Sequence, residues 1–221
     1  MYTKKKKTNI HNAFTMLELI FVIIVLGILA SMAIPRLDRD LRQEAKTAIV
    51  SALRHTKNLA LSDNKTNPSN ASWQKELWQL RFARSDATNN QWFITISSDS
   101  NQLNNVNKAE TFIDPLNGKY MYHLAGDSTL DETDESPNIF LSKKYGVDSV
   151  VFTGDIGCAG ANHIAFDNLG RPHSKLGATS TTHLYASYLK TDCNITIGFE
   201  NPDIAAITIT IQKETGYISA L

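Results

Sequence analysis

Glu18 is the residue that could take part in chemistry, because its carboxylate lies near the start of an otherwise uncharged apolar run. The run covers residues 14–34, which as a helix would be about 30 Å long, the thickness of the hydrocarbon core of a bilayer. A carboxylate in such a segment is costly and needs a partner, and an amine would neutralise it. A cut between Ala13 and Phe14 would create an amine one helical turn before Glu18, or on a neighbouring copy.

Two ordinary interpretations of the same run stay open. The segment 31–33, Ser-Met-Ala, offers small residues before a cut, as in a secretory signal, and a simple signal anchor is the other alternative. A secretory signal would leave Glu18 unexplained, and its apolar region is usually about 7 to 15 residues, shorter than this run. A lipoprotein is excluded because no cysteine precedes Cys158.

The order of features at the N-terminus carries a family resemblance. A leader with four lysines is followed by Ala13, Phe14, Glu18 at the fifth position after the cut, and Pro35 at the twenty-second. This order resembles the prepilin leader of type IV pilins and type II secretion pseudopilins, although Ala13 stands where that family usually has Gly. The resemblance implies that a prepilin peptidase removes residues 1–13 and methylates the new amine of Phe14. It also implies that Glu18 and Pro35 serve filament assembly.

The pattern after Pro35 predicts the remaining elements. Apolar residues recur at spacings of three and four to about residue 62, which continues the helix as an amphipathic one, and the polar run 63–72 ends it. Residues 99–137 are predicted as a long loop or insertion. Alternating runs predict strands at 77–83, 91–97, 149–153, 163–166, 194–199, 204–211 and 217–220.

These elements predict an α+β fold, and the resemblance implies a type IV pilin-like one. Its long N-terminal helix would have a transmembrane half and an amphipathic half, packed on an antiparallel β-sheet domain. The expected segments are a cleaved leader (1–13), a transmembrane and filament-core helix (14–35), the amphipathic half (36–62) and a β-rich periplasmic domain (63–221). The expected location is the bacterial inner membrane, spanned once, with the C-terminal domain in the periplasm and assembly into a pilus or pseudopilus.

Two segments of the C-terminal half refine the resemblance. The strand and turn at 164–172, IAFDNLGRP, and the closing run at 207–218 are similar to the H-type minor pseudopilins and their pilus relatives. The alternative is that both segments are generic turn chemistry, since any antiparallel sheet needs such turns.

Cys158 and Cys193 are the only cysteines. An even count in an oxidising compartment favours a disulfide between them, and two buried free thiols are the alternative. The bridge would close a loop that is worth about 4 kcal/mol in the chain-entropy model.

Catalytic and metal sites do not assemble in the sequence. His163, His173 and His183 recur every ten residues, unlike a zinc motif, and are expected at the surface or in turns. No nucleophile with a recognisable base and no phosphate loop is present. We therefore expect no enzyme activity, no cofactor and no metal. An acidic run is interpreted as a solvated loop, with calcium binding as the alternative; it contains Asp127, Asp131, Glu132, Asp134 and Glu135.

The leading functional prediction is a structural minor pseudopilin of a type II protein secretion system. Its expected partners are the prepilin peptidase and methylase, other pilins or pseudopilins, the assembly platform and the inner membrane. A minor pilin or competence pseudopilin that helps to import DNA is the second candidate, and a signal-anchored periplasmic enzyme is the third. Without the leader lysines the chain has 18 Lys and Arg against 22 Asp and Glu, which gives no general attraction to DNA. A local basic groove could still form from Arg81, Arg84, Lys143, Lys144, Arg171 and Lys175.

Overall fold

The computed structural model describes residues 15–221 apart from 86–89, 125–132 and 177–186, and of residues 31–40 and Ser85 it describes the backbone alone. The chain divides into two compact units, Met1–Asp40 and Leu41–Leu221. One helix, α1 (Met16–Ser62), begins in the first unit and ends in the second. It continues through Pro35.

The predicted membrane span was wrong. No helix in the described part of the chain is long and apolar enough to cross a membrane. The later part of α1 carries charged side chains such as Lys46 and Arg54. This finding overturns both the pilin-like fold class with a transmembrane half and the single-pass inner-membrane location.

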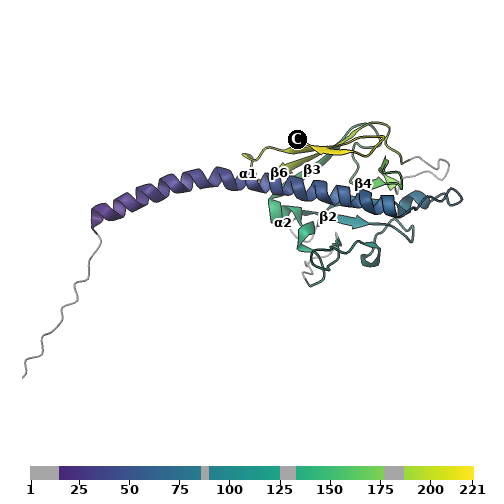
Figure 1. Ribbon diagram of the computed structural model, residues 1–221, viewed down its shortest axis with the longest axis horizontal. Helices are drawn as coiled ribbons and strands as arrows, with labels where there is room; N and C mark the ends of the chain where they lie inside the picture. Colours follow the sequence, from purple (N-terminus) through teal and green to yellow (C-terminus); the bar gives the residue numbers. More distant parts are fainter. Residues whose placement is uncertain (1–14, 86–89, 125–132, 177–186) are drawn as a thin grey trace, which may run out of the picture. The chain divides into compact units, whose positions relative to one another are not determined.

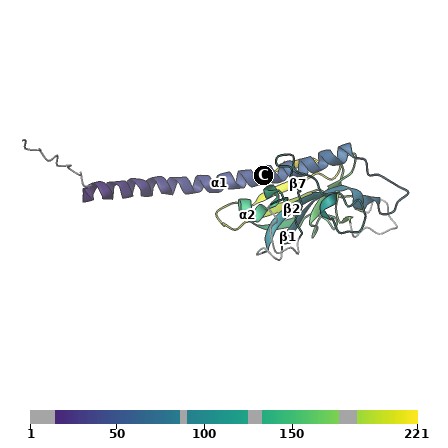
Figure 2. The ribbon, with the colours of Figure 1, turned by 90° about the horizontal axis from the view of Figure 1, so that it is seen from below.

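The later part of α1 is amphipathic. Its buried residues are Ala45, Ile49, Val50, Leu53, Thr56 and Ala60. Their spacing of three and four puts them on one side of the helix. Figure 1 shows this blue part of α1 running along the strands, and in Figure 2 the strands lie on one side of it.

The second unit is α+β, as expected, but its strands form two antiparallel sheets rather than one. The first sheet has the order β2-β1-β4-β5, and the second has the order β3-β6-β7-β8. The first sheet contains β1 (Trp78–Ser85), β2 (Gln91–Ser97), β4 (His163–Phe166) and β5 (Pro172–His173). The second contains β3 (Val147–Thr153), β6 (Cys193–Phe199), β7 (Ile207–Ile211) and β8 (Ile218–Ala220).

Both sheets and the buried side of α1 share one hydrophobic core. Alternation sets the inward face of each strand, so that Leu80 and Phe82 of β1 and Ile209 of β7 are buried in this core. Three basic side chains fasten the helix to the second sheet from outside. Arg42 donates to the carbonyl oxygens of Ala205, Ala206 and Leu221, Arg54 to that of Ile218, and Lys57 to those of Thr215 and Gly216.

The two segments that carry the H-type resemblance meet in space. The turn after β4 contains Gly170 (φ +77°), and the turn after β7 contains Gly216 (φ +57°). A Cβ atom at Gly216 would collide with the carbonyl oxygen of Gly170, so the close approach of these two turns requires glycine.

Short elements occupy the remaining described stretches. The 3-10 helices are η1 (Trp73–Glu76), η2 (Lys108–Glu110) and η3 (Pro137–Ile139), and α2 (Leu141–Tyr145) ends at Gly146, which is left-handed at φ +68°. The predicted long loop at 99–137 contains no named strand among its described residues, and isolated bridges such as Ile113 with Tyr120 order it.

Candidate functional site

Glu18 lies in the first turn of α1, where its backbone has a capping partner. Thr15 stands immediately before the helix, and its hydroxyl accepts a hydrogen bond from the Glu18 amide at 3.3 Å. Thr15 and Glu18 thus have the spacing of a capping box, and an acidic side chain in the first turn favours the helix dipole. This local role gives Glu18 a reason for its position that the sequence analysis did not consider. Ala13 and Phe14, the predicted cleavage site, lie outside the described residues.

The Glu18 carboxylate is available for a partner. The residue is exposed, and its carboxylate makes no hydrogen bond or ion pair with any residue that the structure describes. The third predicted assembly residue, Pro35, lies within α1 and belongs to the segment of which only the backbone is described.

Apolar side chains are exposed all along the first part of α1. Met16 is 80% exposed, Leu17 81% and Leu29 58%, although all three are residue types that normally lie in a core. Because consecutive positions are exposed, this apolar surface runs around the helix rather than along one stripe. We call it the apolar sleeve; its large residues are Met16, Leu17, Leu19, Ile20, Phe21, Val22, Ile23, Ile24, Val25, Leu26, Ile28 and Leu29.

Cys158 and Cys193 are joined by a disulfide bond, with 5.5 Å between their Cα atoms. Both residues are fully buried, and they tie the loop after β3 to the first residue of β6. The bond therefore fixes a glycine-containing loop to the central part of the second sheet.

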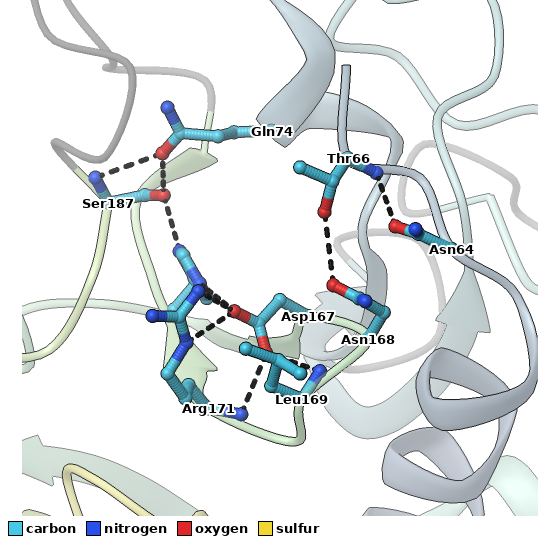
Figure 3. A network of polar contacts seen from close by, with 9 residues as sticks. Asn64, Thr66, Gln74, Asp167, Asn168, Leu169, Arg171 and Ser187 are labelled. Atoms are coloured by element: carbon cyan, nitrogen blue, oxygen red, sulfur yellow. Dashed lines mark hydrogen bonds and ion pairs between the residues drawn. The ribbon is translucent and has the colours of Figure 1, made fainter. Parts of the chain in front are cut away.

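A buried polar network surrounds the turn that follows β4 (Figure 3). Asp167 accepts hydrogen bonds from the backbone amides of Leu169 and Arg171 at 3.0 and 2.9 Å. The Arg171 guanidinium donates to the same carboxylate at 2.7 Å. Burial raises the pKa of Asp167, but its contacts with His173 and Arg171 outweigh the effect of burial and lower the pKa to about 2.

The network contains the three residue types of a hydrolytic triad, a serine, a histidine and an aspartate. The Ser187 hydroxyl lies 2.8 Å from Nδ1 of His173, and Nε2 of His173 lies 3.5 Å from the Asp167 carboxylate. All three side chains are buried, Ser187 being only 5% exposed, and the Ser187 hydroxyl is already hydrogen-bonded to the amide oxygen of Gln74. The described residues leave a substrate carbonyl no approach to this hydroxyl, so their arrangement serves to stabilise the fold.

The expected surface histidines are in fact internal. His163 is nearly buried and His173 is fully buried, while His183 lies outside the described residues. The prediction was wrong because the strands that carry His163 and His173 are covered on both faces. Such covering cannot be read from ten-residue spacing.

The structure describes two of the five acidic residues of this run, Asp134 and Glu135. Asp127, Asp131 and Glu132 lie outside the described residues, Asp134 pairs with Lys108, and the buried Glu135 contacts Nδ1 of His123 at 3.1 Å. No group of three potential metal ligands occurs among the described residues.

No family model, curated protein or solved structure matches this chain.

The basic residues that could have formed one groove are dispersed, with one exception. Arg84 stacks on Trp92 and Arg171 pairs with Asp167, while Lys143 and Lys144 belong to α2. Arg81 and Lys175, by contrast, line the same cavity, together with Lys75, which the sequence analysis missed. The sequence did indicate that Gln79 and Arg81 share one face of β1, because these polar residues alternate with apolar ones.

Proposed function

We propose that this chain is a structural subunit of a pseudopilin-type filament, a minor pseudopilin of a type II protein secretion system. The observation that carries the proposal is the apolar sleeve of α1. Exposed apolar patches of this kind mark surfaces that another molecule covers.

The energetics of the sleeve favour assembly. Full burial of one Leu or Ile side chain is worth about 1.5 to 3 kcal/mol, and the sleeve contains many such residues. Even after the cost of ordering the chains, burial of several side chains per subunit would drive association strongly.

Copies of the same helix are the occupants that fit best. A partner with a single apolar groove would cover one side of α1 and leave the opposite side in water. Because the sleeve runs around the helix, it needs neighbours on several sides, and each further copy brings an equally apolar surface. A helical filament with α1 at its centre satisfies this requirement.

Glu18 would then set how the copies align. Its carboxylate would enter a poorly solvated environment during assembly, where an unpaired charge is costly. Cleavage after Ala13 would give each subunit an amine at Phe14, and this amine on a neighbouring copy would neutralise Glu18. The pair would favour one axial position of the subunits over others.

The proposed partners follow from this mechanism. A prepilin peptidase would cut the chain and methylate Phe14, other pseudopilins would continue the filament, and an assembly platform would insert the subunit. The second unit would be a non-enzymatic domain on the filament, kept rigid by its shared core and its disulfide.

The test replaces Glu18 in the host that produces the protein. In Glu18→Ala the leader should still be removed, but incorporation into filaments, measured by immunoblotting of the filament fraction, should fall at least tenfold. The matched control is Glu44→Ala, which removes an exposed acid from the same helix within the second unit. This variant should assemble normally. Normal assembly of Glu18→Ala would contradict the pairing role, and absence of the wild-type chain from any filament would contradict the proposal itself.

A further inference from the structure

A small cavity lies on the face of β1 that points away from the main core. Leu80 and Phe82 of β1 enter that core, so alternation sends Gln79 and Arg81 to the opposite face. The cavity has a volume of about 210 Å³ and is also lined by residues of η1, of the loop after β2 and of the segment after β5. Its charged side chains are Lys75, Arg81, Asp99 and Lys175.

The charges around this cavity do not cancel. Three cationic side chains, Lys75, Arg81 and Lys175, face a single carboxylate, that of Asp99. The Asp99 carboxylate already accepts hydrogen bonds from the amides of Leu103 and Asn104, at 3.2 and 2.8 Å. The cavity therefore has an excess of positive charge.

Arg81 is the side chain that most needs a ligand. It makes no hydrogen bond or ion pair with any residue that the structure describes, and its Nε atom is buried. Burial lowers the pKa of Arg81, while the charge of Asp99 raises it, and the guanidinium stays charged. The guanidinium is partly buried, and a buried Nε without an acceptor is costly, because buried polar groups in proteins are normally paired.

Gln79 adds a second unsatisfied group with the opposite polarity. The residue is 2% exposed, and its Oε1 atom is buried without a hydrogen-bond partner in the described part of the chain. Gln79 and Arg81 are two residues apart on one strand, so they face the cavity side by side. The cavity thus offers hydrogen-bond donors and an unsatisfied acceptor, Gln79 Oε1.

His163 lies opposite Arg81 in the β1–β4 ladder and also lines the cavity. Burial, and to a lesser degree the charge of Arg81, lowers the pKa of His163 to about 3. Its Nε2 accepts a hydrogen bond from the Leu176 amide at 3.1 Å, and its Nδ1 contacts the side-chain oxygen of Asn162 at 2.8 Å. His163 is therefore neutral and already hydrogen-bonded on both nitrogens.

We propose that this cavity binds a small oxyanion, namely a phosphate that retains a P–OH group. The Arg81 guanidinium would bind the phosphate oxygens, the ammonium groups of Lys75 and Lys175 would add charge, and Gln79 Oε1 would accept the remaining hydrogen. The volume is below the roughly 300 to 1,000 Å³ of pockets for larger organic ligands, which favours a single small group. This site is independent of filament assembly.

The test is calorimetric titration of the full-length chain, kept dispersed in a non-ionic detergent, with inorganic phosphate at low salt. We expect saturable binding to one site, weakened as sodium chloride rises. Arg81→Gln should weaken binding at least tenfold. Arg84→Gln, which removes the same charge from the same strand outside the cavity, should change it less than twofold. Lack of saturable binding, or equal binding by Arg81→Gln and wild type, would overturn the proposal.

Two further measurements keep the test decisive. If Arg81→Gln fails to fold, as judged by circular dichroism, Lys175→Gln replaces it with an expected loss of at least threefold, and an unchanged affinity would overturn the proposal. Dimethyl phosphate cannot donate to Gln79, so it should bind at least threefold more weakly than inorganic phosphate. Binding of dimethyl phosphate or of a short oligonucleotide in preference to inorganic phosphate would instead indicate a phosphodiester ligand and overturn the assignment.

Discussion

The two parts of helix α1 contain similar apolar residues but differ in whether these residues are exposed or buried. Between Met16 and Leu29 the large apolar side chains are exposed on every side, whereas between Leu41 and Ser62 the buried side chains lie on one side only. The later part has its sheets within the same chain, and basic side chains such as Arg42 and Lys57 fasten its edges. The difference teaches that folding buries the apolar side of α1 within the second unit, while it leaves the apolar side chains of the first part exposed.

The largest expected effect of a local change in the second unit is loss of its disulfide. The bridge joins residues 35 positions apart, and a loop of that size is worth about 4 kcal/mol in the chain-entropy model. Replacing both cysteines, Cys158→Ala with Cys193→Ala, should lower the free energy of unfolding by about that amount. Urea unfolding followed by tryptophan fluorescence measures it.

The same double variant tests how separate the two parts are. The proposed leader cleavage should be unaffected, because the bridge lies entirely within Leu41–Leu221. A variant whose unfolding free energy matches the wild type under oxidising conditions would contradict the stabilising role of the bridge.

Leu53 tests the buried side of the later part of α1. It is fully buried in the shared core, and Leu→Ala changes at such sites cost about 2 to 5 kcal/mol. We expect Leu53→Ala to lower the free energy of unfolding by about 3 kcal/mol. Leu61 is the matched control, since it lies on the same helix and is 49% exposed. Leu61→Ala should cost less than about 1 kcal/mol, and equal costs would contradict the one-sided packing.

Replacing Asp167 should lower the free energy of unfolding by an intermediate amount that depends on pH. Its pKa is lowered to about 2 from an ordinary value near 3.8, so its stabilisation is complete above about pH 5 and is lost as pH falls toward 2. At pH 7 we expect Asp167→Asn to be less stable than the wild type by about 2 kcal/mol. Asp203→Asn, at an exposed position, is the control. Unfolding at pH 7 and pH 2.5 should show the difference shrinking with acid; a constant difference would contradict the charge-based explanation.

Much of the fold was predictable from local patterns. The run predicted at 91–97 is β2 (Gln91–Ser97), that at 163–166 is β4 (His163–Phe166), and the α+β class followed from the change of period after residue 72. Alternation is a local property, so it can be read from the chain. The division into two sheets was missed because partner choice depends on long-range contacts.

The cavity around Arg81 shows what local patterns leave out. The alternation in β1 shows which side chains share a face, but not what covers that face. Here the cover comes from η1, the loop after β2 and the segment after β5, which have no periodic pattern. The burial of Gln79, of His163 and of the Arg81 Nε atom therefore could not be predicted, and neither could the convergence of Lys75 and Lys175.

The smallest effect on stability, and the sharpest on assembly, is expected for the apolar sleeve. Leu26 is 59% exposed in the first part of α1, so Leu26→Ala should change the unfolding free energy of the second unit by less than about 0.5 kcal/mol. In a filament the same side chain would be buried against neighbouring copies, and its loss would cost about 1 to 3 kcal/mol per subunit. The variant should therefore unfold like the wild type yet enter filaments severalfold less. A Leu26→Ala chain that unfolded earlier but assembled normally would reverse this expectation and show that the second unit, not a partner, needs this surface.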